Sequence, residues 1–422
     1  MLDLKLIRED PEGVLERLRR RDPTLSLDEL LAQDKRRREL LVQVERLKQQ
    51  RNRASDEIAE LKRQGRDASA EIAQMQEVAR RVRELDQELK ACEADIERLL
   101  VVLPNLPHPS VPVSQRKEDK VLLREWGRKP ELGFKPRNHV ELGRALGILD
   151  FERAARIAGA QFPMHVGLGA RLEWALLSLM IDMNVREHGY TLVLPPYLAN
   201  PTSLFVAGNL PKFGDQLYRC ESDDLYLIPT AEVSLANLHR GEILSESDLP
   251  LRYAAYSACF RREAGTYGAG ERGLIRVHQF NKVELFKFTT AETSYDELDS
   301  MVQDAERILQ RLGLHYRVML LPSGDIAQQS AKTVDIEVWL PAQEAYYEVS
   351  SCSNCEDYQA RGGNVRYRTE EGRIRFVHTL NGSGLATPRL MVAILESFQQ
   401  EDGSVVVPPA LRPYLGGVEA IR

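Results

Sequence analysis

The chain has 422 residues, of which 43% are hydrophobic and 28% charged, and its formal net charge is −6. This composition is typical of a globular protein with two or more domains, because the length exceeds one ordinary core. It excludes a protein that coats nucleic acid through overall positive charge, although a local basic patch is compatible with it.

No apolar run approaches the roughly 18 residues of a membrane span, and the start, MLDLKLIREDPEG, lacks a basic region followed by an apolar one. We therefore expect a cytoplasmic protein without a membrane partner. The five cysteines are spread along the chain, which is not typical of a disulfide framework. Cys352 and Cys355 form a CxxC motif, but zinc would need two further ligands, so no zinc is expected.

The first predicted elements are two long helices within about residues 28–103, interrupted at Gln64-Gly65-Arg66-Asp67. Apolar residues recur at alternating spacings of four and three, which is the seam pattern of a coiled coil. We predict an antiparallel hairpin with limbs of roughly 50 Å. The seam positions are Leu40, Val44, Leu47, Arg51, Ala54, Ile58 and Leu61 in the first helix, and Met75, Val78, Val82, Leu85, Leu89, Cys92, Ile96, Leu99 and Leu103 in the second.

The two limbs differ in charge. Residues 35–66 hold 11 Lys/Arg against 5 Asp/Glu, whereas residues 67–100 hold 5 against 9. Solvated charges and ion pairs between the limbs would explain this in any coiled coil. A basic limb that contacts phosphates, with Lys35-Arg36-Arg37-Arg38 near its base, is the functional alternative. The pattern alone favours the first explanation.

Prolines at positions 104, 107, 109 and 112 end the second helix and stiffen the segment that follows. They predict a domain boundary, with one domain over residues 1–110 and another over 111–422. In the second domain, short β-like runs lie among helical stretches such as 169–187 and 388–400. Because no regular βαβ repeat is present, we predict an α+β fold with a mostly antiparallel sheet flanked by helices.

The stretch LIPTAEVSL (227–235) sets Thr230, Ala231 and Glu232 between apolar residues, where they either cap a helix or face a ligand.

Further along, FRREAGTYGAGERGLIRVHQF (260–280) carries four arginines and four glycines between two predicted strands. At period two, Arg261 and Glu263 share one face of the first strand. Arg276, Phe280 and Glu284 share one face of the second, together with His278 and Lys282. Solvated charges at a hairpin tip would explain any one arginine but not the whole set, because a carboxylate on a potential core face needs a partner. No helix follows the glycines, so this is not a dinucleotide fingerprint.

In HTLNGSGLATPRLMVAILES (378–397) we predict a strand ending at Asn381, a glycine turn, and a helix capped by Thr387 with Pro388 in its first position. Arg389 then lies in the first turn, where the helix dipole disfavours a cation. This indicates an anion or aromatic ring as its partner, with simple packing as the alternative. Upstream, the carboxylates Asp335, Glu337 and Glu348 with two serines offer oxygen ligands that suit Mg²⁺, although an exposed acidic sheet face would look the same.

Together these stretches resemble the three signature motifs of class II aminoacyl-tRNA synthetases, and the chain is most similar to the bacterial seryl-tRNA synthetases. The helix 169–187 with EHGYTLVLPPYL resembles the first motif, FRREAGTYGAGERGLIRVHQFNKVE the second and GLATPRLMVAILE the third. The TAE triplet and the hairpin are family features too, so the resemblance covers essentially the whole chain. It departs from the family at Gly362-Gly363, where Arg-Ala usually follows Arg361, and at Thr-Pro before Arg389, where many relatives have glycine.

The resemblance implies that the protein activates L-serine with ATP to seryl-adenylate and pyrophosphate. It would then transfer the seryl group to the terminal adenosine of tRNA(Ser), with tRNA(Sec) as a second candidate. It also implies Mg²⁺ as cofactor, a homodimer built on the first motif, a tRNA-binding N-terminal domain and a catalytic domain over 111–422.

Roles for single residues follow from the same resemblance. Arg261 would bind the α-phosphate and the substrate carboxylate region, Glu263 the adenine amino group and Arg276 the γ-phosphate, with Phe280 and Arg389 on either side of the adenine. Glu284 would take the serine ammonium, and Glu232 with Ser383 the hydroxyl. The catalytic residues implied are Arg261, Glu263, Arg276 and Arg389. The complete sets are Arg261, Arg262, Glu263, Arg276, Val277, Phe280, Glu348, Val349, Ser350, Ser351 and Arg389 for ATP, Thr230, Ala231, Glu232, Arg261, Glu284, Asn381 and Ser383 for serine, and Glu348 and Ser351 for Mg²⁺.

Three alternatives stay open. An enzyme of the same fold could charge a carrier protein, but such homologues lack the helical arm. A non-catalytic RNA-binding relative would have lost Arg261, Arg276, Glu284 or Arg389, and all four are present. A coiled-coil interaction protein with an unrelated α+β domain would leave the arginine-glycine segment unexplained.

Overall fold

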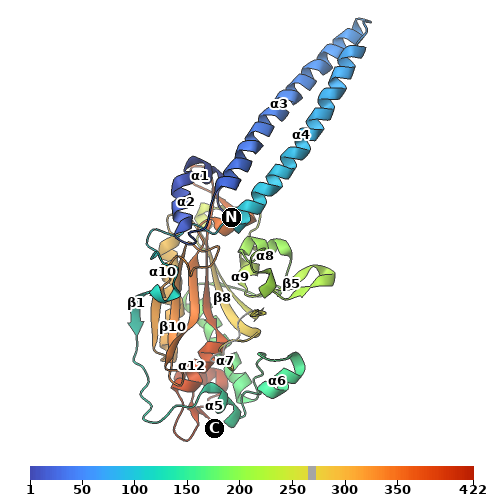
Figure 1. Cartoon of the computed structure of the whole chain (residues 1–422). Coiled ribbons are helices and arrows are strands. Elements are labelled where there is room, and N and C mark those ends of the chain that lie inside the picture. Colours follow the sequence, from blue (N-terminus) through green and yellow to red (C-terminus); the bar gives the residue numbers. More distant parts are fainter. Residues whose placement is uncertain (265–271) are drawn as a thin grey trace. The chain divides into compact units, whose positions relative to one another are not determined.

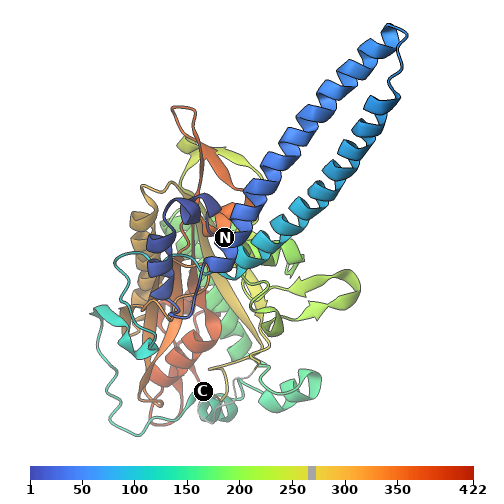
Figure 2. The same ribbon diagram turned by 45° about the horizontal axis from the view of Figure 1, so that its top comes forward.

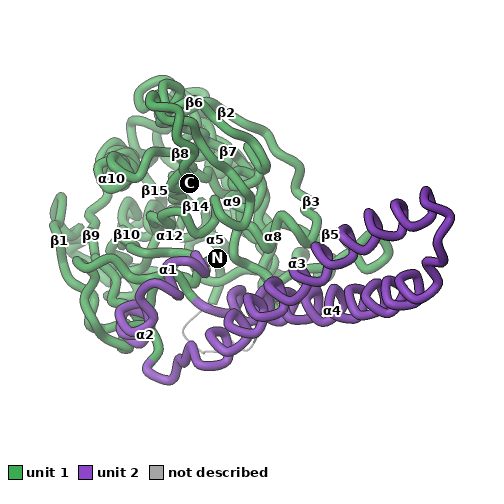
Figure 3. The backbone as a smooth tube through the Cα atoms, turned by 90° about the horizontal axis from the view of Figure 1, so that it is seen from above, with its two compact units in different colours: residues 1, 20–22, 104–422 green, residues 2–19, 23–103 purple. Residues whose placement is uncertain are grey.

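The computed structural model describes residues 1–264 and 272–422 (Figure 1). The middle of the arginine-glycine segment, residues 265–271, lies outside the described residues. The chain divides into two compact units (Figure 3). Residues 2–19 and 23–103 form the smaller unit, and residues 1, 20–22 and 104–422 form the larger one. The short segment 20–22 therefore belongs to the larger unit, although it lies between two parts of the smaller one.

The smaller unit consists of helices α1 (Leu4–Glu9), α2 (Pro11–Arg19), α3 (Asp28–Arg63) and α4 (Ser69–Val102). Helices α3 and α4 lie side by side (Figures 1 and 2), which confirms the predicted hairpin. They have 36 and 34 residues, so each limb is about 50 Å long. The connection turns at Gly65, whose φ of 69° favours glycine.

The hairpin seam follows the predicted heptads where the side chains are apolar. Leu40, Val44 and Ile58 of α3 are buried, and so are Val82, Leu85, Cys92 and Ile96 of α4. Arg51 is exposed, so its placement in the seam was wrong; a charged head group stays in water unless it is paired.

Some of the basic charge of α3 is compensated within the hairpin. Arg36 pairs with Glu88, Arg37 with Glu93 and Lys48 with Asp86. In contrast, the exposed side chains of Arg46, Arg51 and Arg53 make no hydrogen bond or ion pair to any residue that the structure describes. Ion pairs between the limbs therefore account for part of the basic charge, and phosphate contact by the exposed arginines stays a prediction.

The larger unit is built on an eight-stranded sheet in the order β1-β9-β10-β11-β14-β8-β7-β2. Neighbouring strands are antiparallel except β2 and β7, which are parallel, and this confirms the predicted α+β class with a mostly antiparallel sheet. The strands are β1 (Val121–Trp126), β2 (Thr191–Val193), β7 (Leu251–Phe260), β8 (Gln279–Thr289), β9 (Tyr316–Leu320), β10 (Lys332–Leu340), β11 (Ala345–Asn354) and β14 (His378–Ala386).

Three helices, α7 (Leu168–Asp182), α10 (Ser294–Leu312) and α12 (Thr387–Ser397), pack against the sheet (Figure 1). Their side of the sheet holds the main core, which includes Val283 and Leu285 of β8. Because side chains alternate along a strand, Lys282 and Glu284 of β8 point to the other side, as predicted. The main core and the polar residues Lys282 and Glu284 thus occupy opposite faces of β8, and Phe286 and Phe288, further along the polar face, belong to a second apolar cluster.

Shorter elements complete the larger unit. They are α5 (His139–Ala145), α6 (Phe151–Ala158), α8 (Pro201–Ala207), α9 (Glu232–Leu235), α11 (Tyr358–Gly363), β3 (Leu198–Ala199), β4 (Arg219–Cys220), β5 (Leu225–Leu227), β6 (Ile243–Ser245), β12 (Arg366–Arg368), β13 (Ile374–Phe376), β15 (Val405–Val406) and β16 (Ala420–Ile421). No helix in the described ranges is both long and apolar enough to cross a membrane.

The strands around the arginine-glycine segment are shorter than predicted. β7 ends at Phe260 and β8 begins at Gln279, so Arg261, Glu263 and Arg276 lie just beyond the strands. Glu263 has a φ of 48°, which is incompatible with an extended strand. The backbone NH of Arg261 still donates to the carbonyl of His278 over 2.9 Å, so the two segments remain paired at this point.

The predicted glycine turn after Asn381 was wrong, because β14 continues through Gly382 and Gly384 to Ala386. A Cβ atom on Gly382 would lie 2.7 Å from the Cys352 sulfur, and one on Gly384 would lie 2.8 Å from Leu285. These glycines therefore allow close packing rather than a turn. Helix α12 begins at Thr387, whose hydroxyl donates to Glu173 over 2.5 Å instead of capping the helix.

Candidate functional site

Two adjoining pockets lie on the polar side of the sheet. The first, of about 270 Å³, is the arginine pocket, and the second, of about 400 Å³, is the carboxylate pocket. Both are lined by Arg261, Glu263, Lys282, Glu348 and Ser383, so they form one continuous site. The arginine pocket also includes Leu274, Ile275, Arg276, Val277, Phe280, Val349, Ala386, Pro388 and Arg389, and the carboxylate pocket includes Asn209, Phe213, Gln216, Leu217, Pro229, Thr230, Glu232, Glu284, Ala327, Gln329, Ser351, Ser353 and Asn381.

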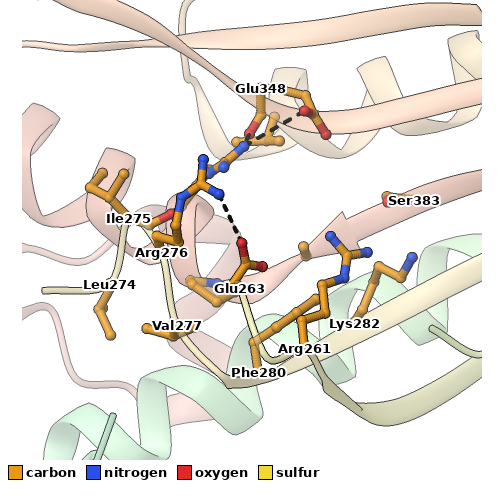
Figure 4. A pocket seen from close by; sticks show the side chains of 14 residues that line it. Arg261, Glu263, Leu274, Ile275, Arg276, Val277, Phe280, Lys282, Glu348 and Ser383 are labelled. Atoms are coloured by element: carbon orange, nitrogen blue, oxygen red, sulfur yellow. Dashed lines mark hydrogen bonds and ion pairs between the residues drawn. The ribbon is translucent and has the colours of Figure 1, made fainter. Parts of the chain in front are cut away.

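Side chains from both sides of the arginine-glycine segment meet in the arginine pocket. A terminal nitrogen of Arg276 donates to Glu263 over 2.8 Å (Figure 4). The guanidinium carbon of Arg261 lies 5.2 Å from the centre of the Phe280 ring, within the range of a cation–π contact. The pocket therefore presents fixed cations beside a flat aromatic ring, a combination that suits an anionic ligand with a planar part.

Arg389 lies in the first turn of α12, as predicted. Its Nη1 donates to the carbonyl of Glu348 over 2.8 Å and its Nε to the carbonyl of Ile275 over 3.2 Å. The Glu348 carboxylate lies 3.7 Å from the same Nη1. These contacts offset the unfavourable helix dipole and hold the guanidinium at the pocket wall.

Glu284 is the central anion of the carboxylate pocket and is almost fully buried. It forms a short ion pair with the Nζ of Lys282 and accepts a hydrogen bond from the Thr230 hydroxyl over 2.6 Å. The Thr230 hydroxyl also accepts from the backbone NH of Glu232 over 3.2 Å. Thr230 thus contacts the start of α9 and the pocket anion together.

Glu232 lines the same pocket and accepts hydrogen bonds from two glutamines. One carboxylate oxygen accepts from the amides of Gln359 over 2.8 Å and Gln329 over 3.2 Å. Burial, assisted by the negative charge of Glu284, raises the pKa of Glu232 to about 7. At neutral pH this carboxyl is therefore able to donate or to accept a hydrogen bond.

The expected metal ligands Glu348 and Ser351 both line the carboxylate pocket. Asp335 of β10 pairs in register with Ser351 of β11 and is buried. Burial, followed by the charge of Glu348, raises the pKa of Asp335, and its Oδ1 has no hydrogen-bond partner in the described part of the chain. Oxygen ligands beside an unsatisfied carboxylate fit a hard cation such as Mg²⁺.

Cys352 and Cys355 are buried free thiols, and no cluster of three or more His, Cys, Asp or Glu within residues 1–264 and 272–422 is placed to hold a metal.

Three of the expected ligand-binding residues lie outside both pocket linings. Ala231 is buried in a neighbouring apolar cluster, Arg262 is exposed, and the Ser350 hydroxyl donates to the Ser383 carbonyl over 2.6 Å. The family departure at Gly362 and Gly363 falls in α11, which packs against α8. A Cβ atom on Gly363 would lie 3.1 Å from Val206, so the close approach of these helices favours glycine.

No role was predicted for Lys282, Gln329 or Gln359. Lys282 could have been singled out, because it alternates with Phe280 and Glu284 along β8. The two glutamines gave no signal, since they lie outside every motif and reach Glu232 only through the fold.

Comparisons with known proteins cover both units. Residues 1–107 match the family model of the seryl-tRNA synthetase N-terminal domain. Residues 218–398 match the tRNA synthetase class II core domain (G, H, P, S and T). The chain is 55% identical to a serine–tRNA ligase of Syntrophobacter fumaroxidans over 422 residues and 53% identical to one of Geobacillus kaustophilus over 424 residues, with 100% of each chain covered.

Solved structures show the same similarity. The seryl-tRNA synthetase of Pyrococcus horikoshii complexed with ATP has a TM-score of 0.94 and 39% identity, and the similarity covers 100% of this chain and 99% of that one. The cytoplasmic serine–tRNA ligase of Naegleria fowleri in complex with AMP has a TM-score of 0.89 and 29% identity, with the same coverage.

Proposed function

The chain belongs to the family of seryl-tRNA synthetases, and we propose that its two pockets divide the work of a serine–tRNA ligase between them. The arginine pocket binds ATP and the carboxylate pocket binds L-serine. The observation that carries this assignment is the position of Arg261, which lines both pockets and so lies where the α-phosphate and the serine carboxylate would meet.

In the arginine pocket, catalysis consists of positioning and charge neutralisation. Arg261 binds the α-phosphate and Arg276 the γ-phosphate, while Phe280 and Arg389 contact the two faces of the adenine. Glu263 recognises the adenine amino group and orients Arg276 through their ion pair. Cations fixed before the reaction stabilise the charge that develops on the phosphates. No side-chain nucleophile is needed, because the serine carboxylate attacks the α-phosphorus of ATP and pyrophosphate leaves.

In the carboxylate pocket, different residues bind the ammonium and the hydroxyl of serine. The ammonium of serine binds Glu284, whose present partners are Lys282 and Thr230. Glu232 and Ser383 bind the hydroxyl, with Asn381 beside them. Alanine keeps the ammonium but would leave the groups of Glu232 and Ser383 that bind the hydroxyl without that partner, which supports discrimination by about 10⁴ or more. Threonine is excluded by the size of the pocket.

Glu348 and Ser351 would hold Mg²⁺, with Asp335 paired in register with Ser351 on the neighbouring strand. When bound, the ion supplies positive charge to the phosphates of ATP. Glu348 lines both pockets, so a cation that it held would be available to a ligand in either one.

The N-terminal domain binds tRNA(Ser) through the helical arm, and tRNA(Sec) is a second candidate. Arg46, Arg51 and Arg53 of α3 are the proposed phosphate contacts, since Arg36 and Arg37 already pair with α4. Replacing the first three by glutamine should raise the KM for tRNA and flatten its salt dependence. The matched control replaces Arg36 and Arg37 by glutamine and should change the KM for tRNA and its salt dependence much less. Equal effects in the two variants would contradict the assignment.

The catalytic domain forms a homodimer in the cytoplasm. Trp174 of α7 is 61% exposed, and Leu192 and Leu194 at β2 are 41% and 71% exposed. These apolar side chains lie in the stretch that resembles the first class II motif, and a second copy of the chain would cover them.

The proposed function is tested by amino-acid-dependent exchange of pyrophosphate into ATP with each of the twenty amino acids, followed by charging of total tRNA. Serine alone should support rapid exchange, and the charged tRNA should be tRNA(Ser). Absence of serine-dependent exchange would refute the assignment of both pockets. Exchange without tRNA charging would favour a carrier-protein acceptor instead.

A further inference from the structure

Arg21 is a buried arginine whose described hydrogen-bond partners are all backbone carbonyls. Its side chain is only 8% exposed, and burial lowers its pKa to about 10. Nη2 donates to Ile326 and Ala327 over 2.6 and 2.8 Å. Nη1 donates to Asn105, Gln328 and Ser330 over 3.0, 3.3 and 3.0 Å. A guanidinium suits this position because its five N–H groups form a rigid fork.

Asn105 completes the same network. Its backbone NH donates to the carbonyl of Gln328 over 2.8 Å, and its side-chain amide donates to the carbonyls of Gln329 over 2.9 Å and Cys355 over 2.8 Å. Between them, Arg21 and Asn105 bind every carbonyl of residues 326–330. This segment lies outside the helices and strands of the sheet, so these hydrogen bonds fix its backbone.

The other side of segment 326–330 forms part of the carboxylate pocket. Ala327 and Gln329 line that pocket, and the Gln329 amide donates to Glu232 over 3.2 Å. Gly208 lies against Gln329 from another direction, where an added Cβ would be 3.1 Å from the Gln329 Cβ. No residue of the segment lines the arginine pocket. The network is therefore connected to one of the two pockets only.

We propose that Arg21 and Asn105 are positioning residues for serine recognition. They fix segment 326–330, the segment places the Gln329 amide, and that amide orients the carboxyl of Glu232. The inference rests on the proposed function of the carboxylate pocket and extends it to two residues that touch no substrate. Its consequence is selective: loss of the guanidinium weakens serine binding and leaves ATP binding unchanged.

The test measures the KM values for serine and for ATP in pyrophosphate exchange. Arg21→Met should raise the KM for serine about tenfold or more while the KM for ATP stays within about twofold. Arg21→Lys retains three donors and should recover part of the loss. Arg19→Met replaces an exposed arginine at the end of α2 and should leave both constants unchanged. A parallel rise of both constants in Arg21→Met, or no change in either, would overturn the proposal.

Gln329→Ala supplies a second measurement that does not depend on the buried guanidinium. It should raise the KM for serine selectively, and combining it with Arg21→Met should add little, because both changes act on the same link to Glu232. Fully additive effects would overturn the link, and so would an unchanged KM for serine in Gln329→Ala. If the wild-type protein shows no serine-dependent exchange, the proposed function fails as well. If the wild-type protein shows exchange and the variants have the same KM for serine, only the role of Arg21 and Asn105 is wrong.

Discussion

Replacing Glu232 by glutamine tests the electrostatics of the carboxylate pocket, because it keeps the side-chain shape and removes the ionisation. Burial raises the pKa of Glu232 from 4.5 to about 7, so the folded protein holds this proton more tightly than the unfolded chain does. The stability contributed by the proton is fully present below about pH 4.5 and is lost as the pH rises through about 7. At about 1.36 kcal/mol per pKa unit, the shift corresponds to about 3 kcal/mol.

Glutamine has no such dependence, and its amide oxygen still accepts from Gln329 and Gln359. Relative to the wild type, Glu232→Gln should therefore gain about 3 kcal/mol in free energy of unfolding between pH 4.5 and pH 8. The assay is urea unfolding without serine at several pH values, followed by tryptophan fluorescence. Glu371→Gln, at an exposed position, is the control and should show no such trend. A difference between Glu232→Gln and wild type that stays constant across this pH range would refute the raised pKa and the reasoning from burial.

Three further changes address the other parts of the enzyme. Arg276→Ala should lower serine-dependent exchange on the order of 10²-fold or more without changing the unfolding midpoint, and unchanged exchange would remove its phosphate role. Lys282→Met leaves the buried Glu284 without its cation, which should lower the free energy of unfolding by about 3 kcal/mol. Added serine should then raise the melting temperature more than in wild type, and an equal rise in both proteins would show that the ammonium binds elsewhere. Deleting residues 35–100 should spare exchange and abolish tRNA charging, whereas normal charging would show that the arm is dispensable.

Local periodicity was enough to predict the helical arm and the polar face of β8. Leu40, Val44 and Ile58 occupy the predicted seam, and Lys282 and Glu284 share the predicted strand face. These features depend on repeats of 3.5 and 2 residues, which are properties of the sequence itself.

Strand ends and pocket walls could not be predicted in this way, because long-range packing decides them. Gly382 and Gly384 lie within β14, where Cys352 and Leu285 pack too closely for a Cβ atom. Glu263 leaves the strand through a positive φ that no spacing indicates. Gln329 reaches Glu232 from 97 residues away, and such a contact has no local signature.

The position of Arg21 also bears on the order in which the protein is made. Arg21 is synthesised 305 residues before Ile326. Ile326 is the first of its carbonyl acceptors in segment 326–330. At about 5–20 residues per second, translation separates donor and acceptor by roughly 15–60 s. During that interval the helices α3 and α4 have all their mutual contacts available, whereas the guanidinium has none of its carbonyls in segment 326–330. Segment 326–330 of the carboxylate pocket therefore cannot bind Arg21 until late in synthesis, and we expect a chain stalled before residue 326 to have a folded arm but an incomplete carboxylate pocket.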